Sequence, residues 1–242
     1  MAGLIAKCFT TNYELAILIA AGGSGTRFGG DKLLQEFRGM PLFCHCLKNF
    51  DAPGRQFVLA VPAEAKPAYN AIISSYLIDF KGVITLVKGG ASRMESVAHA
   101  FAAIEEQPSK PEFVAIHDAA RPLADAELLE RCLSAARECG AAIAAHRVTD
   151  TIHVAQGDNA DDACAAIAST PPRETLWAAE TPQVFRTALY ARALHDLDWR
   201  SNPPTDDASL VARLPGVQVR LVENSTPNPK ITYRHDLLRY QN

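Results

Sequence analysis

The first apolar run of this 242-residue chain opens directly into a glycine-rich loop that carries two basic residues, Arg27 and Lys32. Residues 15–19 are apolar without polar alternation, which is typical of a strand buried on both faces of a parallel sheet. A loop without side chains leaves backbone N–H groups open to phosphate oxygens. The glycines concerned are Gly22, Gly23 and Gly25. Their spacing matches neither the dinucleotide-binding fingerprint nor the Walker loop, and a solvated surface loop is the simpler alternative.

Two glycines and a serine follow a second predicted strand, residues 84–87. Gly89 and Gly90 come first, and Ser96 lies in the first turn of the helix predicted next. Ligands of a parallel sheet bind beyond the carboxyl ends of its strands. Backbone groups and one hydroxyl at such a place can read the edge of a base. The alternative is a tight turn followed by an ordinary serine near a helix N-terminus.

An acidic residue stands at the end of a third predicted strand, residues 113–116. Asp118 follows this strand, and its carboxylate can hydrogen-bond a ribose hydroxyl or hold Mg²⁺. Arg121 precedes a proline, and we expect it to be structural and to pair with a carboxylate.

Three later polar positions have plainer interpretations from the residues alone. Thr181, beside a proline, is predicted to begin a turn. Residues 205–209 have the pattern of a helix N-cap, and capping accounts for most of that pattern. Lys230 is a single cation in a strand-like context.

The composition excludes several classes of protein. With 48% hydrophobic residues, 21% charged residues and a net charge of −3, the chain lacks the basic excess of a nucleic-acid-binding domain. The six cysteines form no CxxC pair, so we expect free thiols in a reducing cytoplasm. The fragment from Cys44 to Cys46 has no second ligand pair, which argues against structural zinc. No segment approaches the ~20 apolar residues that cross a bilayer, so a soluble protein is expected.

Apolar runs alternate with helix-length segments, which predicts βαβ units and a parallel sheet. Besides those already named, the predicted strands are 57–61, 141–145 and 217–221. The predicted helices are 41–49, 65–76, 93–106, 125–139 and about 187–197, with others beginning near 206 and at 234. Residues 147–176 interrupt the pattern and are expected to form an extended arm. Because such an arm has little core of its own, it must bury its apolar residues against another surface, for which a second subunit is the natural candidate.

Six motifs together carry a resemblance to a known family. They are AAGGSGTRFGGDK, GGASRMESV, HDAARP, ETPQVF, TDDAS and NPKIT. In this order and at this spacing they resemble the 2-C-methyl-D-erythritol 4-phosphate cytidylyltransferases. The combination of HDAARP with TPQ separates this family from the molybdopterin guanylyltransferases, which share only the first loop. The resemblance implies an α/β fold with a Rossmann-like, mostly parallel sheet. It further implies a single nucleotidyltransferase domain over residues 1–242, CTP and Mg²⁺ as ligands, and a homodimer built through the arm.

The resemblance also implies roles for individual residues. Arg27 and Lys32 are similar to the pair that stabilises charge on the reacting phosphates. The CTP loop would comprise Ala20, Ala21, Gly22, Gly23 and Gly25. The segment similar to the cytosine-reading part of the family comprises Gly89, Gly90 and Ser96. Asp118 resembles the acid on the ribose or metal side, with the phosphates as the other source of metal ligands.

On the acceptor side, Thr181, Thr205 and Lys230 match substrate-positioning residues of the family. Thr151 and Arg173 match arm residues that reach the neighbouring subunit's substrate.

Two positions depart from the family's pattern: Asp31 replaces a proline before Lys32, where it could lower the availability of the lysine, and Pro229 replaces an isoleucine and stiffens the approach to Lys230. A cytidylyltransferase for another polyol phosphate, such as ribitol 5-phosphate, and a non-catalytic nucleotide-binding regulator are the alternative functions.

We predict that Arg27→Ala and Lys32→Ala each lower kcat by about 100- to 1000-fold while weakening CTP binding far less. Their charge matters most as the phosphorus centre gains negative density in the transition state. Lys32→Arg should rescue only part of the rate, because a planar fork does not replace a point charge. Steady-state kinetics and CTP calorimetry measure the two effects. A near-normal kcat with only a raised KM for CTP would contradict the assignment.

Overall fold

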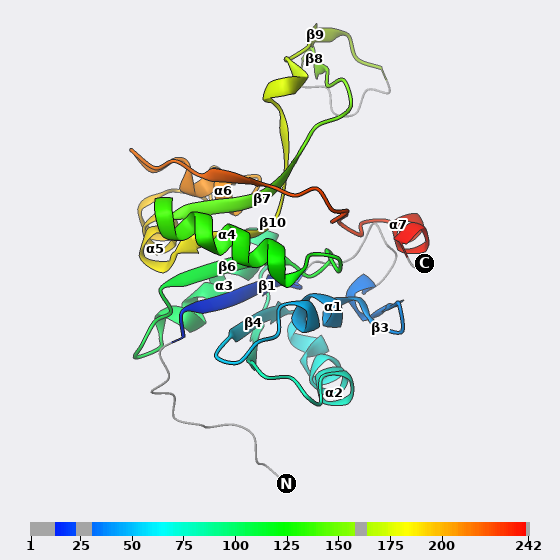
Figure 1. Ribbon diagram of the computed structural model, residues 1–242, viewed down its shortest axis with the longest axis vertical. Helices are drawn as coiled ribbons and strands as arrows, with labels where there is room; N and C mark the ends of the chain where they lie inside the picture. The colour runs from blue at the N-terminus through cyan, green and yellow to red at the C-terminus, as the bar shows by residue number, and fades with distance from the viewer. Residues whose placement is uncertain (1–12, 23–30, 158–163, 241–242) are drawn as a thin grey trace.

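The computed structural model describes residues 13–22, 31–157 and 164–240, and its centre is a seven-stranded sheet (Figure 1). The strand order is β11-β7-β10-β6-β1-β4-β5. These strands are β1 (Leu15–Ala20), β4 (Gln56–Val61), β5 (Val83–Lys88), β6 (Phe113–Asp118), β7 (Ala141–Arg147), β10 (Trp177–Arg186) and β11 (Arg220–Glu223). β1 pairs in parallel with both β4 and β6, and β4 pairs in parallel with β5. The mostly parallel sheet predicted from the apolar runs is confirmed.

Helices cover both faces of this sheet. The helices are α1 (Leu42–Asn49), α2 (Lys66–Tyr76), α3 (Arg93–Glu105), α4 (Ala126–Cys139), α5 (Thr187–Asp196), α6 (Asp207–Val211) and α7 (Arg234–Tyr240). One apolar core joins α1 and α4 to one face of the strands, and a second joins α3, α5 and α6 to the other face. Short pieces complete the described part: β2 (Glu36–Phe37), β3 (Met40–Pro41), and 3₁₀ turns at Lys32–Leu34, Ala63–Ala65 and Arg173–Thr175.

Local capping signals explain where two of the predicted helices begin and end. Ser92 and Glu95 form a reciprocal capping box at the start of α3. Asp125 caps α4, and Gly140 ends that helix in the left-handed conformation with φ 87°. These polar side chains and the glycine satisfy backbone groups that a helix end leaves without partners.

Two sequence-based boundaries are wrong. The strand predicted at 217–221 lies instead at β11, because its register is set by parallel pairing of Arg220–Glu223 with β7. Thr181 begins no turn and lies inside β10, which is antiparallel to both β6 and β7. The pairing with β7 shifts register between Ala179 and Gln183, and this irregularity accommodates Pro182, which has no N–H for a ladder.

The predicted arm is present as a structural feature. β7 ends at Arg147 and β10 begins at Trp177, and between them residues 148–157 and 164–176 extend away from the sheet, as Figure 1 shows. Two short antiparallel strands, β8 (Val154–Ala155) and β9 (Ile167–Ser169), lie within it. Ile152, Val154 and Ile167 on this arm are 41%, 46% and 59% exposed. The homodimer expected from the arm stays a prediction.

Candidate active site

Two glycine segments predicted to bind a nucleotide meet at the carboxyl edge of the sheet. A Cβ added to Gly89 would lie 3.0 Å from the Cα of Gly22, and one added to Gly22 would lie 2.6 Å from Ser96 Oγ. Side chains at these glycines would therefore collide with the neighbouring segment. Ala20 ends β1 and Ala21 N donates to Ala60 O, which places both alanines at the same edge. Gly23, Gly25 and Arg27 lie outside the described residues.

The backbone at Gly22, Gly89 and Gly90 forms a glycine cradle, and the hydroxyl of the buried Ser96 makes two hydrogen bonds beside it. Its Oγ accepts from Gly90 N at 3.0 Å and donates to Ser92 O at 2.9 Å. The hydroxyl thus holds the Gly90 turn against the start of α3. One route by which Ser96 can influence a bound base is therefore through the backbone that it positions.

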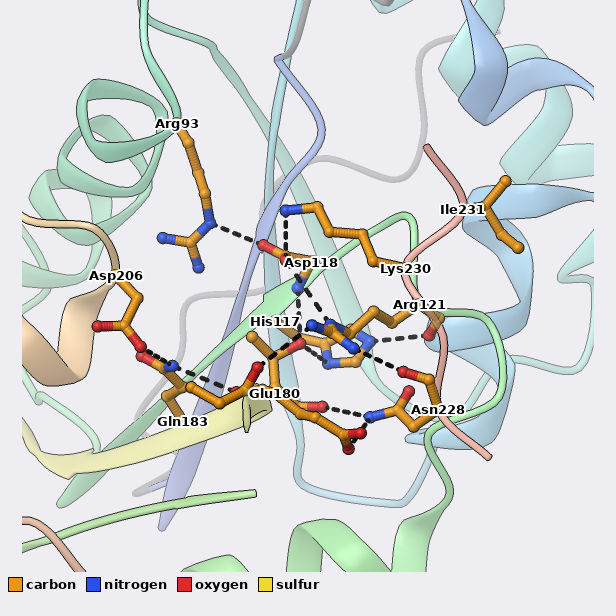
Figure 2. A network of polar contacts seen from close by, with 12 residues as sticks. Arg93, His117, Asp118, Arg121, Glu180, Gln183, Asp206, Asn228, Lys230 and Ile231 are labelled. Atoms are coloured by element: carbon orange, nitrogen blue, oxygen red, sulfur yellow. Dashed lines mark hydrogen bonds and ion pairs between the residues drawn. The ribbon is translucent and has the colours of Figure 1, made fainter. Parts of the chain in front are cut away.

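Asp118, at the end of β6, is a buried carboxylate that faces three cations (Figure 2). Arg93 Nε lies 2.7 Å from Oδ1, and Lys230 Nζ lies 2.8 Å from Oδ2. Arg121 Nε lies 3.8 Å from Oδ2, so the carboxylate partner expected for this arginine is Asp118. Burial alone would raise the pKa of Asp118, but the charges of Arg93 and Lys230 outweigh it and hold that pKa well below its ordinary value. Asp118 is therefore ionised at neutral pH.

Arg93 is a residue of this cluster that the sequence analysis did not single out. Its Nη1 lies 2.6 Å from Oδ2 of the fully buried Asp207, whose Oδ1 accepts from Tyr190 OH at 2.6 Å. Arg93 is the first residue of α3. A cation is electrostatically unfavourable at a helix N-terminus, which is a signal that could have drawn attention to it.

The segment that carries Lys230 is not a strand, contrary to the sequence-based expectation. Residues 224–233 have no regular secondary structure, and contacts with other elements hold them in place. Arg121 Nη1 donates to Asn228 O at 2.6 Å, and Ile231 N donates to Ala120 O at 2.8 Å. Lys32 Nζ donates to Ile231 O at 2.7 Å. One short segment therefore contains Lys230 and is contacted by Lys32, the two lysines that were predicted to lie in the site.

Asp31 has a local structural role beside Lys32. Its carboxylate accepts from Leu33 N at 3.1 Å, which caps the Lys32–Leu34 turn, and from Tyr69 OH at 3.4 Å. Burial raises the pKa of Asp31 and outweighs these hydrogen bonds, which lower it. The departure from the family pattern therefore supplies a cap to the turn that presents Lys32.

Thr181 lies beneath Asp118 in a buried chain of hydrogen bonds. Its Oγ1 accepts from Asp118 N at 3.1 Å and lies 2.9 Å from His117 Nδ1. His117 Nε2 lies 3.1 Å from the carbonyl oxygen of Arg121, so Nε2 must donate and Nδ1 must accept from Thr181. Burial lowers the pKa of His117 to about 4. This neutral imidazole is fully committed to supporting the backbone around Asp118.

The remaining predicted site residues, Thr205, Thr151 and Arg173, are exposed. Thr205 is exposed, and its hydroxyl donates to Ser209 Oγ at 3.3 Å beside the Asp206 cap of α6. Thr151 and Arg173 are exposed on the arm, where Arg173 Nη1 donates to Thr149 O at 2.9 Å. Within a single chain the arm extends away from the sheet (Figure 1).

Among the described residues, no group of three His, Cys, Asp or Glu side chains is arranged to hold a metal ion. Cys44 and Cys46 are buried in α1, and His45 Nε2 lies 2.6 Å from Phe37 O. The cysteines in the described part of the chain are all free thiols. None of the helices described is both long enough and apolar enough to span a membrane.

Comparison with known proteins gives consistent matches. Residues 15–242 match the family model described as 2-C-methyl-D-erythritol 4-phosphate cytidylyltransferase. A protein of that name from Bacillus velezensis is 35% identical over 229 residues, which cover 93% of each chain. Another from Syntrophotalea carbinolica is 38% identical over 230 residues, covering 93% of this chain and 94% of the relative. The crystal structure of one from Thermus thermophilus superposes with a TM-score of 0.72 at 31% identity, covering 94% of this chain and 97% of that chain.

We predict that His117 stays neutral down to about pH 5, because its pKa in the folded protein is about 4. The unfolded chain takes up this proton near its ordinary pKa of about 6.5. Since the unfolded state then binds more protons, this residue lowers the free energy of unfolding as the pH falls from about 6.5 towards 4. Imidazole resonances followed by NMR titration measure the midpoint directly.

Urea unfolding of a His117→Asn variant is the control, because it should lose this part of the pH dependence. A His117 titration midpoint between about pH 6 and 7, near the ordinary value, would contradict the assignment of His117 as a buried, neutral imidazole.

Proposed function

Since this chain belongs to the 2-C-methyl-D-erythritol 4-phosphate cytidylyltransferase family, we propose that it transfers CMP from CTP to 2-C-methyl-D-erythritol 4-phosphate and releases pyrophosphate. The observation that carries the proposal is the group of cations around Asp118, beside a glycine cradle at the carboxyl edge of the sheet. Such a site suits two polyanionic substrates that must be brought together. The family membership makes the chain a nucleotidyltransferase of isoprenoid precursor biosynthesis.

The chemistry needs no general base. A phosphate oxygen of the acceptor is already ionised at neutral pH, and it attacks the α-phosphorus of CTP. The new phosphorus–oxygen bond forms as the bond to the bridging oxygen breaks, and the electron pair leaves with pyrophosphate. The neutral, buried His117 is consistent with this scheme, because both of its ring nitrogens are engaged in hydrogen bonds within the protein. Positioning and preorganised positive charge then supply most of the rate enhancement.

We assign the nucleotide side to the glycine cradle. The backbone at Ala20, Ala21, Gly22, Gly23 and Gly25 would surround the phosphates of CTP. The turn at Gly89 and Gly90, held by Ser96, would read the pyrimidine edge and leave little room for a purine. Asp118 would face the ribose side while it also holds Lys230.

We assign the reacting phosphates to Arg27 and Lys32, and the acceptor to Lys230. The Lys230 side chain is 43% exposed while its Nζ lies 2.8 Å from Asp118 Oδ2, which would leave it able to meet an incoming phosphate. Thr181 would contribute indirectly, because its hydroxyl oxygen accepts a hydrogen bond from the backbone N–H of Asp118. We also assign Thr205, an exposed residue next to the Asp206 cap of α6, to positioning of the polyol.

Mg²⁺ fits this site only as a partner of the substrate. Both oxygens of Asp118 are engaged by cations, and the described residues form no acidic cluster around it. Mg²⁺ commonly keeps several waters and binds through one or two carboxylates plus substrate phosphates. We therefore propose that the ion arrives on the phosphates of CTP, with Asp118 as the nearest protein carboxylate. When bound, it would neutralise charge on the leaving pyrophosphate.

We further propose that the chain forms a single nucleotidyltransferase domain in a cytoplasmic homodimer, with the arm of one subunit completing the acceptor pocket of the other. The exposed apolar residues of the arm support this arrangement, because an isolated two-stranded ribbon has little core of its own. Thr151 and Arg173 would then contact the substrate held by the partner.

A pyrophosphate-release assay with a panel of nucleotides and polyol phosphates tests the function. We expect kcat/KM with CTP to exceed that with ATP by on the order of 100-fold, because a pocket shaped for a pyrimidine excludes the larger base. Among acceptors, 2-C-methyl-D-erythritol 4-phosphate should be preferred over ribitol 5-phosphate. Comparable values for CTP and ATP would refute the nucleotide assignment. Binding of CTP without turnover of any acceptor would favour the regulator.

Mixing two inactive variants tests the composite pocket. Arg173→Ala and Lys230→Ala should partly complement each other, because a heterodimer contains one site with both residues intact. Each heterodimer has two pockets, of which only one has both residues intact, so the recovery of activity must stay partial. The measurement is pyrophosphate release after subunit exchange, with each variant alone as the control. A fully active monomer in sedimentation, or no recovery between dimers that exchange, would exclude the shared pocket.

A further inference from the structure

Glu180 is a buried carboxylate that the proposed reaction does not use directly. It lies in β10 with only 4% of its surface exposed, and its two oxygens accept from three side chains. Asn224 Nδ2 and Asn228 Nδ2 each lie 2.9 Å from Oε2, and His146 Nδ1 lies 2.7 Å from Oε1. Figure 2 shows Glu180 and Asn228 together below Asp118 and Lys230.

The two asparagines bracket the start of the irregular segment that leads to Lys230. Asn224 N donates to Ala145 O at 2.8 Å, so the segment leaves β11 at a fixed point on β7. Asn228 Nδ2 also donates to Thr181 O at 3.0 Å, which ties the other end to β10. Without a helix or strand to hold it, this stretch of backbone depends on such side-chain anchors.

The free-energy cost of burying Glu180 indicates that its position matters. A buried charge is expensive unless it is paired and hydrogen-bonded, and apolar residues of similar volume often give equal or better stability. Arg121 supplies nearby positive charge and also donates to Asn228 O at 2.6 Å. Glu180 and Arg121 therefore hold Asn228 from two sides, two residues before Lys230.

We propose that Glu180 is a positioning residue for the acceptor side of the site: it anchors Asn224 and Asn228 and thereby fixes the approach of Lys230 to Asp118. The inference rests on the proposed function, because that function gives Lys230 its contact with the acceptor phosphate. His146, at the foot of the arm, binds the other oxygen of the same carboxylate.

Glu180→Met tests this role, since it keeps the approximate size of the side chain and removes both acceptor oxygens. We expect the KM for 2-C-methyl-D-erythritol 4-phosphate to rise about tenfold while the KM for CTP changes by less than about twofold. Glu180→Gln should restore most of the activity, because one amide oxygen can still accept from both asparagines. Glu223→Gln is the matched control: this exposed carboxylate adjoins Asn224 and should leave both constants unchanged.

A double-mutant cycle with Lys230→Ala separates positioning from general destabilisation. If Glu180 acts through Lys230, Glu180→Met should weaken calorimetric binding of the acceptor by less than about twofold in the Lys230→Ala background. Should Glu180→Met fail to fold, Asn228→Ser removes the same anchor and enters the same cycle.

The inference is overturned if the losses in the two backgrounds are equal, if the KM for CTP rises as much as that for the acceptor, or if Glu180→Gln is as impaired as Glu180→Met. If the wild-type protein turns over the acceptor and the Glu180→Met variant has the same kinetic constants, this inference alone is overturned. Absence of wild-type turnover with the acceptor would instead overturn the proposed function.

Discussion

The buried carboxylate of Asp118 is the interaction on which the rest of the site depends. Three cations from α3, the loop after β6 and the late irregular segment converge on it. Each would repel the others without a shared anion, and each loses hydration on approaching the edge of the sheet. One carboxylate at the end of a central strand thus holds together parts of the chain that are more than one hundred residues apart.

A second layer of neutral and charged groups supports this arrangement from below. His117 and Thr181 fix the backbone of Asp118, Asp207 and Tyr190 hold the far side of Arg93, and Glu180 holds the segment before Lys230. Buried polar groups of this kind are costly when any member lacks a partner. A site that must orient two anions benefits from such rigidity, because its cations then need little rearrangement as charge develops on phosphorus.

The glycine cradle imposes a different constraint, one of space. Gly22 and Gly89 approach so closely that neither could carry a side chain without displacing the other segment. This close approach brings the end of β1 against the end of β5 across the intervening β4. Phosphate-binding backbone and base-reading backbone are thereby held next to the Asp118 cluster, on one edge of one sheet.

Much of this was determined by sequence alone, wherever the signal is local. Unbroken apolar runs predicted the parallel strands, helix-length segments between them predicted the helices at 93–106 and 125–139, and the change of pattern after residue 146 predicted the arm. The order of six motifs also predicted the family. These features depend on neighbouring residues or on pattern, which a linear chain displays directly.

Only the tertiary structure decided how distant residues pair. The antiparallel insertion of β10 between β6 and β7 moved Thr181 from a supposed turn to a buried position beneath Asp118. The contact of Lys32 with Ile231 joins residues 199 positions apart, and the contacts of Arg93 with Asp207 and of Glu180 with Asn228 join residues 114 and 48 positions apart. A charged residue carries no local mark of the partner that will neutralise it, because that partner is selected by the packing of elements around a common core.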